Sequence, residues 1–208
     1  MSRLNKFDSP FKDLLQARKL NRLERYQLEN TITSNNVSGH THWVLILSLI
    51  IKDQIELYIK KTYHKSISYK VLVEMATFHD LGECVTGDMD YIAKKAGVLD
   101  TKGEAEFIWN RFHSSDIFSK YLDSIMVDQI EEGEWDWEKN IVKCADMLEH
   151  LIYCYEEQEL FGNRSMFEPL TKGVEVVRDH FKEVYMQSDI VQEITDRCEL
   201  ALKTNPLS

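Results

Sequence analysis

The sequence predicts an all-α fold, and three observations lead to this prediction. The chain of 208 residues holds only three prolines and eight scattered glycines, so few residues interrupt a helix. Apolar residues recur at spacings of three and four along several segments, which is the period of an α-helix. No segment shows a convincing alternation of apolar and polar residues, the pattern of a strand. We therefore expect a single helical domain over residues 8–204, with short tails at 1–7 and 205–208.

Local signals place the individual helices. Asp8 or Ser9 would cap the first helix, with Pro10 at its first position. The centre of the second, WVLILSLII, is apolar on nearly every side, so this helix belongs in the core. The third ends before Gly82, and the stretch 82–103 after it is expected to be a long, partly irregular connection. In order, the expected helices cover residues 11–28, 38–61, 68–81, 102–112, 115–131, 138–160, 166–187 and 189–203.

The composition limits the classes of partner. The chain carries 25 Lys and Arg against 35 Asp and Glu, a formal charge of -10. Because phosphate contacts along a polymer need clustered basic residues, we expect no nucleic-acid polymer as the main partner. A single nucleotide needs only a metal and one or two Arg or Lys. The N-terminus lacks an apolar signal core, and the longest apolar run, 43–51, is too short to span a bilayer. We expect no membrane partner and a cytoplasmic location.

Four residues of metal-binding type lie on or beside apolar faces of the expected helices. His40 shares its face with apolar residues four, seven and eleven positions later. His79 shares its face with apolar residues three, four and seven positions earlier. Asp80 lies about 100° further round that helix, and Asp146 borders the apolar stripe of the helix at 138–160. Several separate helices therefore each direct a ligand-type side chain toward the core.

This set of side chains suits one divalent metal ion. A lone His on an apolar face is more often a satisfied core residue than a ligand. A buried Asp, however, is rare unless it is paired or bound to a metal. Two imidazoles and two carboxylates can hold an ion and leave positions open for water and substrate. The candidate metals are Mn, Co, Zn, Fe, Ni and Mg, to which such ligands are suited to different degrees.

Three short strings carry a resemblance to a known family. NVSGHT at 36–41 resembles the family segment NVSEHS. FHDLGE at 78–83, followed by TGD at 86–88, resembles HDxxE…TGD, and KCAD at 143–146 resembles KxAD. Together they resemble the HD-domain metal-dependent phosphohydrolases and, within them, the bacterial YfbR-like 5'-deoxynucleotidases and their phage relatives. The resemblance covers about residues 25–157. It implies a helical bundle with a metal site at its centre.

The resemblance also implies a role for each matching residue. Two of these roles are catalytic: Glu83 would do general acid/base work, and Asp88 would orient or polarise the attacking water. Arg25 matches an Arg that grips the 5'-phosphate. Tyr26 stands where the family has a Trp packed near the sugar, which puts sugar discrimination in question. Lys94 would either reach the phosphate or lie on the solvated surface. The metal ligands would be His40, His79, Asp80 and Asp146.

The leading prediction is an enzyme that removes the 5'-phosphate from deoxyribonucleoside 5'-monophosphates with the help of one divalent metal. A dNTP triphosphohydrolase of the dATP-directed type that some phage relatives resemble is a close alternative. A non-catalytic nucleotide-binding or regulatory protein is an alternative of another class, and the presence of Glu83 and Asp88 argues against it. The resemblance also implies a homodimer. His150, four residues after Asp146, would either assist the site or lie on the surface.

Overall fold

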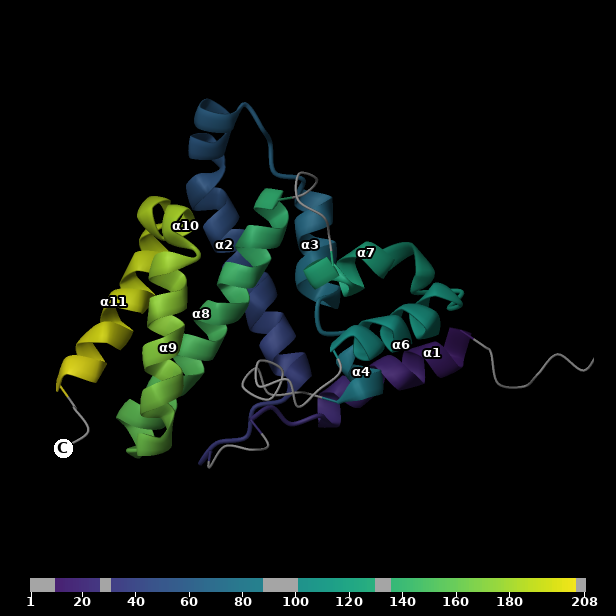
Figure 1. Cartoon of the computed structure of the whole chain (residues 1–208), viewed down its shortest axis with the longest axis horizontal. Coiled ribbons are helices and arrows are strands. Elements are labelled where there is room, and N and C mark those ends of the chain that lie inside the picture. The colour runs from purple at the N-terminus through teal and green to yellow at the C-terminus, as the bar shows by residue number, and fades with distance from the viewer. Residues whose placement is uncertain (1–9, 27–30, 88–100, 130–135, 205–208) are drawn as a thin grey trace, which may run out of the picture.

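The described part of the chain is helical, as Figure 1 shows. The structure, a computed structural model, describes residues 10–26, 31–87, 101–129 and 136–204. In these ranges there is no strand, and one isolated antiparallel bridge joins Glu24 to Asn36. The all-α prediction is confirmed, whereas the domain extent of 8–204 stays a prediction. No helix within the described ranges is long and apolar enough to cross a membrane.

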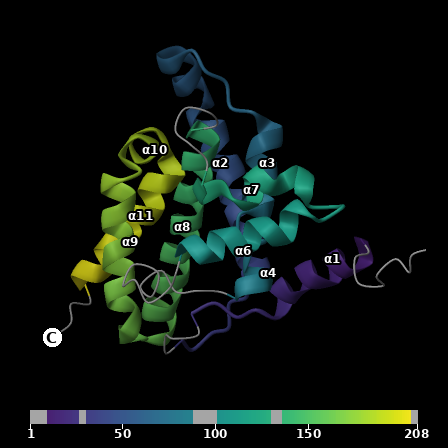
Figure 2. The ribbon, with the colours of Figure 1, turned by 45° about the vertical axis from the view of Figure 1, so that its right-hand side comes forward.

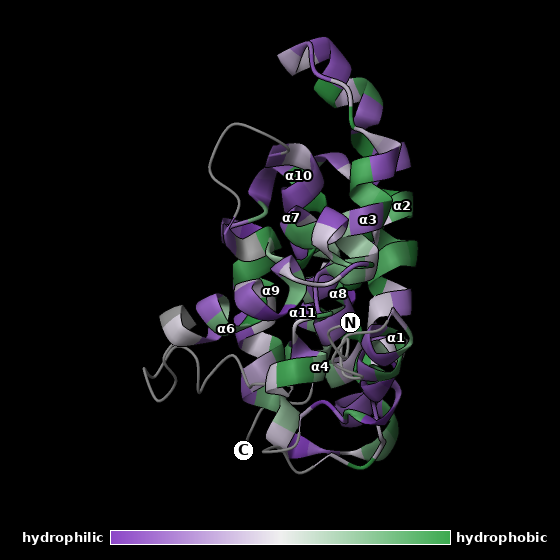
Figure 3. Cartoon of the chain, turned by 90° about the vertical axis from the view of Figure 1, so that its right-hand side faces the viewer, coloured by the Kyte–Doolittle hydropathy of each residue, from purple (hydrophilic) through white to green (hydrophobic). Residues whose placement is uncertain are grey.

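Three helices form the centre of the fold: α2 (Val37–Tyr63), α3 (Tyr69–Phe78) and α8 (Asp136–Phe161). Their apolar faces meet in the main hydrophobic cluster, where Ile51, Leu72 and Leu148 are fully buried. In Figure 3 the ribbon of α2 carries hydrophobic colours over much of its length. The expectation that this apolar helix belongs to the core is therefore confirmed.

Shorter helices cover the two sides of this centre (Figures 1 and 2). One side holds α9 (Phe167–Asp179), α10 (Lys182–Gln187) and α11 (Asp189–Thr204), with the 3-10 turn η4 (Arg164–Met166) before them. The other side holds α1 (Pro10–Ala17), η1 (Arg18–Arg22), α4 (Glu83–Thr86), α6 (Thr101–His113), η2 (Ser119–Tyr121), α7 (Leu122–Ile125) and η3 (Val127–Gln129). A second, smaller hydrophobic cluster forms on this side around Phe112 and Phe118.

Helix α9 approaches α8 closely at Gly173. A Cβ atom at this position would lie 2.6 Å from Cδ2 of Leu151 and 3.5 Å from Cδ2 of His150. Leu151 is fully buried, so its side chain has little room to move aside. Glycine at position 173 therefore permits the short distance between α9 and the helix that carries Asp146.

The first expected helix, 11–28, is wrong in its second half. Helix α1 ends at Ala17, and a 3-10 turn follows to Arg22. The backbone is then extended at Leu23, whose carbonyl accepts the N–H of Val37 at 3.0 Å. The N–H of Arg25 donates to the carbonyl of Asn35 at 2.8 Å. This pairing with the segment before α2 replaces the helical hydrogen bonds that local propensity favours.

Three other expected boundaries also change. The helix expected at 115–131 is divided into η2, α7 and η3, and the one expected at 166–187 is divided into α9 and α10. At the second division Phe181 has a non-helical backbone (φ -100°, ψ 26°) and is buried against the main cluster. Burial of this ring therefore accompanies the bend. The connection expected at 82–103 begins with the short helix α4.

We expect Leu148→Ala to lower the free energy of unfolding by about 2–5 kcal/mol, because it leaves a cavity in a fully buried part of the core. Urea unfolding followed by circular dichroism measures the change. Leu57→Ala is the matched control, since Leu57 is 61% exposed on α2, and its effect should stay within about 0.5 kcal/mol. Equal effects of the two substitutions would contradict the assignment of the core.

Candidate active site

The four expected metal ligands come together from three parts of the fold. His40 lies in the first turn of α2, His79 and Asp80 follow α3 directly, and Asp146 lies in α8. The Nε2 atom of His40 is 3.4 Å from Nε2 of His79, 3.1 Å from Oδ1 of Asp146 and 3.2 Å from Oδ2 of Asp80. The same Oδ2 atom is 3.3 Å from Nε2 of His79. Residues 106 positions apart in the sequence thus share one small polar centre.

Local sequence signals explain why His40 is in place. The side chain of Asn36 caps α2 by accepting the N–H of Gly39 at 2.8 Å, so the helix begins where the sequence predicts. The same helix face then buries Val44, Leu47 and Ile51. Burial of this face turns His40 inward, and its side chain is completely buried.

The outer nitrogens of the two imidazoles fix their orientation. Nδ1 of His40 lies 2.6 Å from Oε2 of Glu149, and Nδ1 of His79 lies 3.0 Å from the carbonyl of Ala76. An ionised carboxylate and a carbonyl only accept, so each Nδ1 carries the hydrogen and donates it. In the neutral rings, the lone pair of each Nε2 therefore faces the centre.

When both rings are neutral, these lone pairs and the carboxylates of Asp80 and Asp146 are all acceptors, and without a metal the raised pKa of His40 keeps a proton among them. The ligand atoms of His40, His79 and Asp146 all lie within 4.8 Å of one another. Such a set is repulsive unless a cation or a proton lies between its members, and it suits a divalent metal. The residues present therefore fit the metal ion that the sequence leads us to expect.

The pKa values in the centre result from burial on one hand and from hydrogen bonds and nearby charges on the other. Burial and the charge of Arg25 lower the pKa of His40, but hydrogen bonds with the surrounding carboxylates outweigh both and raise it well above its usual value. Burial raises the pKa of Asp146, but its hydrogen bond with His40 and the charge of that ring lower it well below its usual value. Burial likewise opposes ionisation of Asp80, but the charge of His79 and the hydrogen bond with His40 lower its pKa. The carboxylates are therefore ionised and ready to bind a cation.

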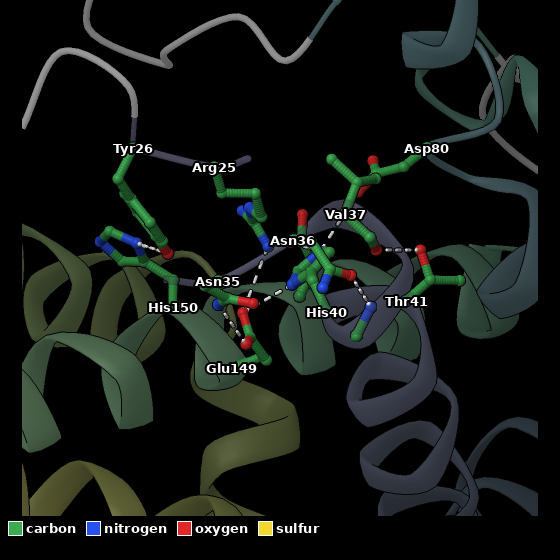
Figure 4. A network of polar contacts seen from close by, with 12 residues as sticks. Arg25, Tyr26, Asn35, Asn36, Val37, His40, Thr41, Asp80, Glu149 and His150 are labelled. Atoms are coloured by element: carbon green, nitrogen blue, oxygen red, sulfur yellow. Dashed lines mark hydrogen bonds and ion pairs between the residues drawn. The ribbon is translucent and has the colours of Figure 1, made fainter. Parts of the chain in front are cut away.

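Glu149 is a site residue that the sequence analysis missed. It is buried on α8, three residues after Asp146 and therefore on the same side of the helix. Its Oε2 atom accepts from His40, and from Arg25 at 3.2 Å. Its Oε1 atom accepts from Asn35 at 3.1 Å. Figure 4 shows these contacts around the carboxylate. The signal that could have found it is a second acidic residue one turn after a candidate ligand.

Arg25 and Tyr26 lie next to this centre, on the extended segment before α2 (Figure 4). The guanidinium carbon of Arg25 is 5.2 Å from the centroid of the Tyr26 ring. Tyr26 has a left-handed backbone (φ 59°), its ring stacks on Tyr153 at 4.5 Å, and its hydroxyl lies 2.9 Å from Nδ1 of His150. The ring is therefore held from two sides.

His150 thus contacts an expected substrate residue and is not an exposed surface group. Burial and the charge of Arg25 lower the pKa of His150 to about 4, so the ring is neutral at pH 7. A neutral ring can take either role in the hydrogen bond with Tyr26.

Three expected site residues remain, and they are Glu83, Asp88 and Lys94. Glu83 is the first residue of α4, and its N–H donates to the carbonyl of Asp80 at 3.0 Å. A backbone hydrogen bond thus joins Glu83 to the expected ligand Asp80. Asp88 and Lys94 lie outside the described residues. The catalytic roles of Glu83 and Asp88, and the substrate role of Lys94, stay predictions.

Solved structures show which fold this chain shares with known proteins. A protein from Pyrococcus horikoshii OT3 matches with 20% identity and a TM-score of 0.68, covering 89% of this chain and 98% of its own. An HD-domain phosphohydrolase from Listeria innocua matches with 15% identity and a TM-score of 0.68, covering 95% and 93%. The HD phosphohydrolase DatZ of cyanophage S-2L, solved with dA and one catalytic Zn²⁺ ion, matches with 14% identity and a TM-score of 0.52, covering 92% and 96%. The chain therefore has the fold of the HD-domain phosphohydrolases.

The family is narrower than the fold. The model of the 5'-deoxynucleotidase YfbR-like family matches residues 13–190, which is most of the chain. The chain belongs to this family, and the protein is a hydrolase of the HD superfamily. No curated protein matches the sequence. The resemblance expected from the three motif strings is thereby confirmed.

We expect Mn²⁺ or Co²⁺ added to metal-stripped protein to raise its free energy of unfolding, by about 2.7 kcal/mol at a concentration 100 times the dissociation constant. Asp146→Asn should lose most of this stabilisation, because it removes a negative ligand from the centre. Asp53→Asn is the matched control, since that side chain is 77% exposed on α2. Thermal unfolding with and without metal measures the effect. Equal stabilisation of both variants would remove Asp146 from the metal site.

Proposed function

We propose that the protein removes the 5'-phosphate from deoxyribonucleoside 5'-monophosphates, giving a deoxynucleoside and phosphate with the help of one divalent metal ion. The observation that carries the proposal is the position of Arg25 beside a centre of two imidazoles and two carboxylates. Arg25 and His40, one of those imidazoles, both contact the carboxylate of Glu149. With a metal ion bound in that centre, a phosphate placed between the ion and Arg25 would meet a positive charge on each side. Membership of a 5'-deoxynucleotidase family supports the same substrate class.

The residues supply the two requirements of phosphoryl transfer, which are positioning and charge stabilisation. When bound by His40, His79, Asp80 and Asp146, the metal would polarise the phosphate oxygens and lower the pKa of a bound water. Arg25 donates one NH group to Glu149, and its planar guanidinium would also bind the phosphate and neutralise charge that develops on it. Glu83 would take or give the proton at the reacting water or the leaving oxygen. Asp88 would orient that water, and Lys94 would reach the phosphate.

Tyr26 would lie beside the sugar of the substrate. Stacking on Tyr153 and the hydrogen bond with His150 give its ring a fixed position, so it would act as a rigid wall of the sugar site. The solved complex of the cyanophage relative holds dA and Zn²⁺. We infer that this chain also takes a deoxynucleoside group and that zinc is among the metals it accepts. The homodimer and the cytoplasmic location stay predictions.

We expect metal-stripped protein to release phosphate from dNMPs when Mn, Co, Zn or Mg is added, and to act less on the matching NMPs. Phosphate release measured with malachite green, over dNMPs, NMPs and dNTPs, tests this. Asp146→Asn serves as the inactive control. Cleavage of dNTPs alone, with release of triphosphate, would replace the proposal by a triphosphohydrolase. Binding of nucleotide without hydrolysis under every metal would favour a regulatory protein.

We expect Arg25→Ala to lower kcat/KM for a dNMP by about 10- to 100-fold, because hydrogen bonds to a charged group contribute about 1.5–3 kcal/mol. Arg22→Ala is the matched control, since Arg22 is exposed at the end of η1. Its kcat/KM should equal that of the wild type. A similar loss in both variants would mean that general positive charge, and not the position of Arg25, matters.

A further inference from the structure

Glu149 is a buried carboxylate whose two oxygens are both occupied by groups of the candidate site. Oε2 accepts from Nδ1 of His40 at 2.6 Å and from Arg25 at 3.2 Å, and Oε1 accepts from Asn35 at 3.1 Å. The side chain is only 8% exposed. It contacts the side of the His40 ring that faces away from the metal centre. Glu149 is therefore placed to act on the metal through His40 and not as one of its ligands.

The contact with His40 sets what this ring offers to a metal. A ring that donates its Nδ1 hydrogen to a carboxylate keeps the Nε2 lone pair free for the ion, and the negative charge makes that lone pair more basic. Loss of the carboxylate would remove this preference and allow the hydrogen to move to Nε2. That tautomer cannot bind the ion.

The contacts with Arg25 and Asn35 act on the phosphate side. Both residues belong to the segment before α2, and the N–H of Arg25 donates to the Asn35 carbonyl at 2.8 Å. Through these contacts Glu149 joins the paired segment to α8. Arg25 is largely buried, with 15% of its side chain exposed, and a buried guanidinium needs a negative partner. The same carboxylate therefore orients the metal ligand and the phosphate arginine.

We propose that Glu149 is a positioning residue that couples metal binding to phosphate binding, by holding His40 and Arg25 with one carboxylate oxygen. The proposal rests on the metal-dependent function proposed above. It predicts that loss of Glu149 weakens both sites, whereas loss of Arg25 weakens only the phosphate site, because the contact between Glu149 and His40 remains.

Helix α8 offers matched controls, because it carries two other buried glutamates. Glu138 accepts the N–H of Ser68 at 2.6 Å. Glu157 accepts the N–H groups of Ile32 and Thr33 at 2.8 and 2.6 Å. No described contact joins either residue to an expected metal ligand. Glu138→Gln shows how much the loss of any buried charge on this helix changes Mn²⁺ binding. Glu157→Gln shows how much loosening the segment before α2 changes it.

The experiment measures binding of Mn²⁺ alone to the metal-stripped full chain by isothermal titration calorimetry. We expect Glu149→Gln to weaken metal binding by about 10- to 100-fold, the usual effect of losing a partner of a metal-bound histidine. Glu138→Gln, Glu157→Gln and Arg25→Ala should bind Mn²⁺ within about threefold of the wild type. At saturating Mn²⁺, Glu149→Gln should still raise KM for a dNMP, because Arg25 has lost its partner.

The proposal fails if folded Glu149→Gln binds Mn²⁺ as tightly as Glu138→Gln does. If Glu149→Gln does not fold, Glu149→Asp replaces it, since it keeps the charge but withdraws the oxygens from His40. Weaker Mn²⁺ binding by Glu149→Asp supports positioning, and unchanged binding overturns it. Failure of the wild type to bind any metal would instead overturn the proposed function, and this inference with it.

Discussion

The candidate site depends on the two-sided hydrogen bonding of one buried imidazole. His40 faces Asp80, Asp146 and His79 with its Nε2 atom and Glu149 with its Nδ1 atom. A neutral ring cannot donate on both sides, so the carboxylate on the outer side decides that the inner side offers a lone pair. Without the outer carboxylate, the inner carboxylates would meet an N–H group and have less need of a cation.

The fold makes this arrangement possible because two long helices bring their apolar faces together. The faces of α2 and α8 bury Ile51 and Leu148 in the main cluster. His40 and Asp146 belong to the same helices, so the packing that stabilises the core also fixes the distance between these two expected ligands. Ligands on helices are placed more precisely than ligands on loops. Arg25, by contrast, is held by a short extended pairing with the segment before α2.

Much of the fold and of the metal centre could be predicted from the sequence, because both follow from local signals. Helical period and few breakers give the long helices, and the motif strings give His40, His79, Asp80 and Asp146. What the sequence did not reveal depends on contacts between distant segments. The first helix ends early because its continuation pairs with residues near Asn35, and the role of Glu149 depends on its contact with His40, 109 positions away. Neither contact leaves a periodic pattern in the sequence.

The close approach at Gly173 has a consequence for how this protein can diverge. The missing side chain at 173 leaves room for Leu151, whose neighbour His150 contacts Tyr26. A larger residue at 173 requires the Leu151 side chain to shift, or position 151 to become smaller in the same lineage. The two positions should therefore covary among relatives, even though neither touches the metal centre. Because His150, the neighbour of Leu151, contacts Tyr26, the packing of α9 on α8 also bears on the position of the Tyr26 ring.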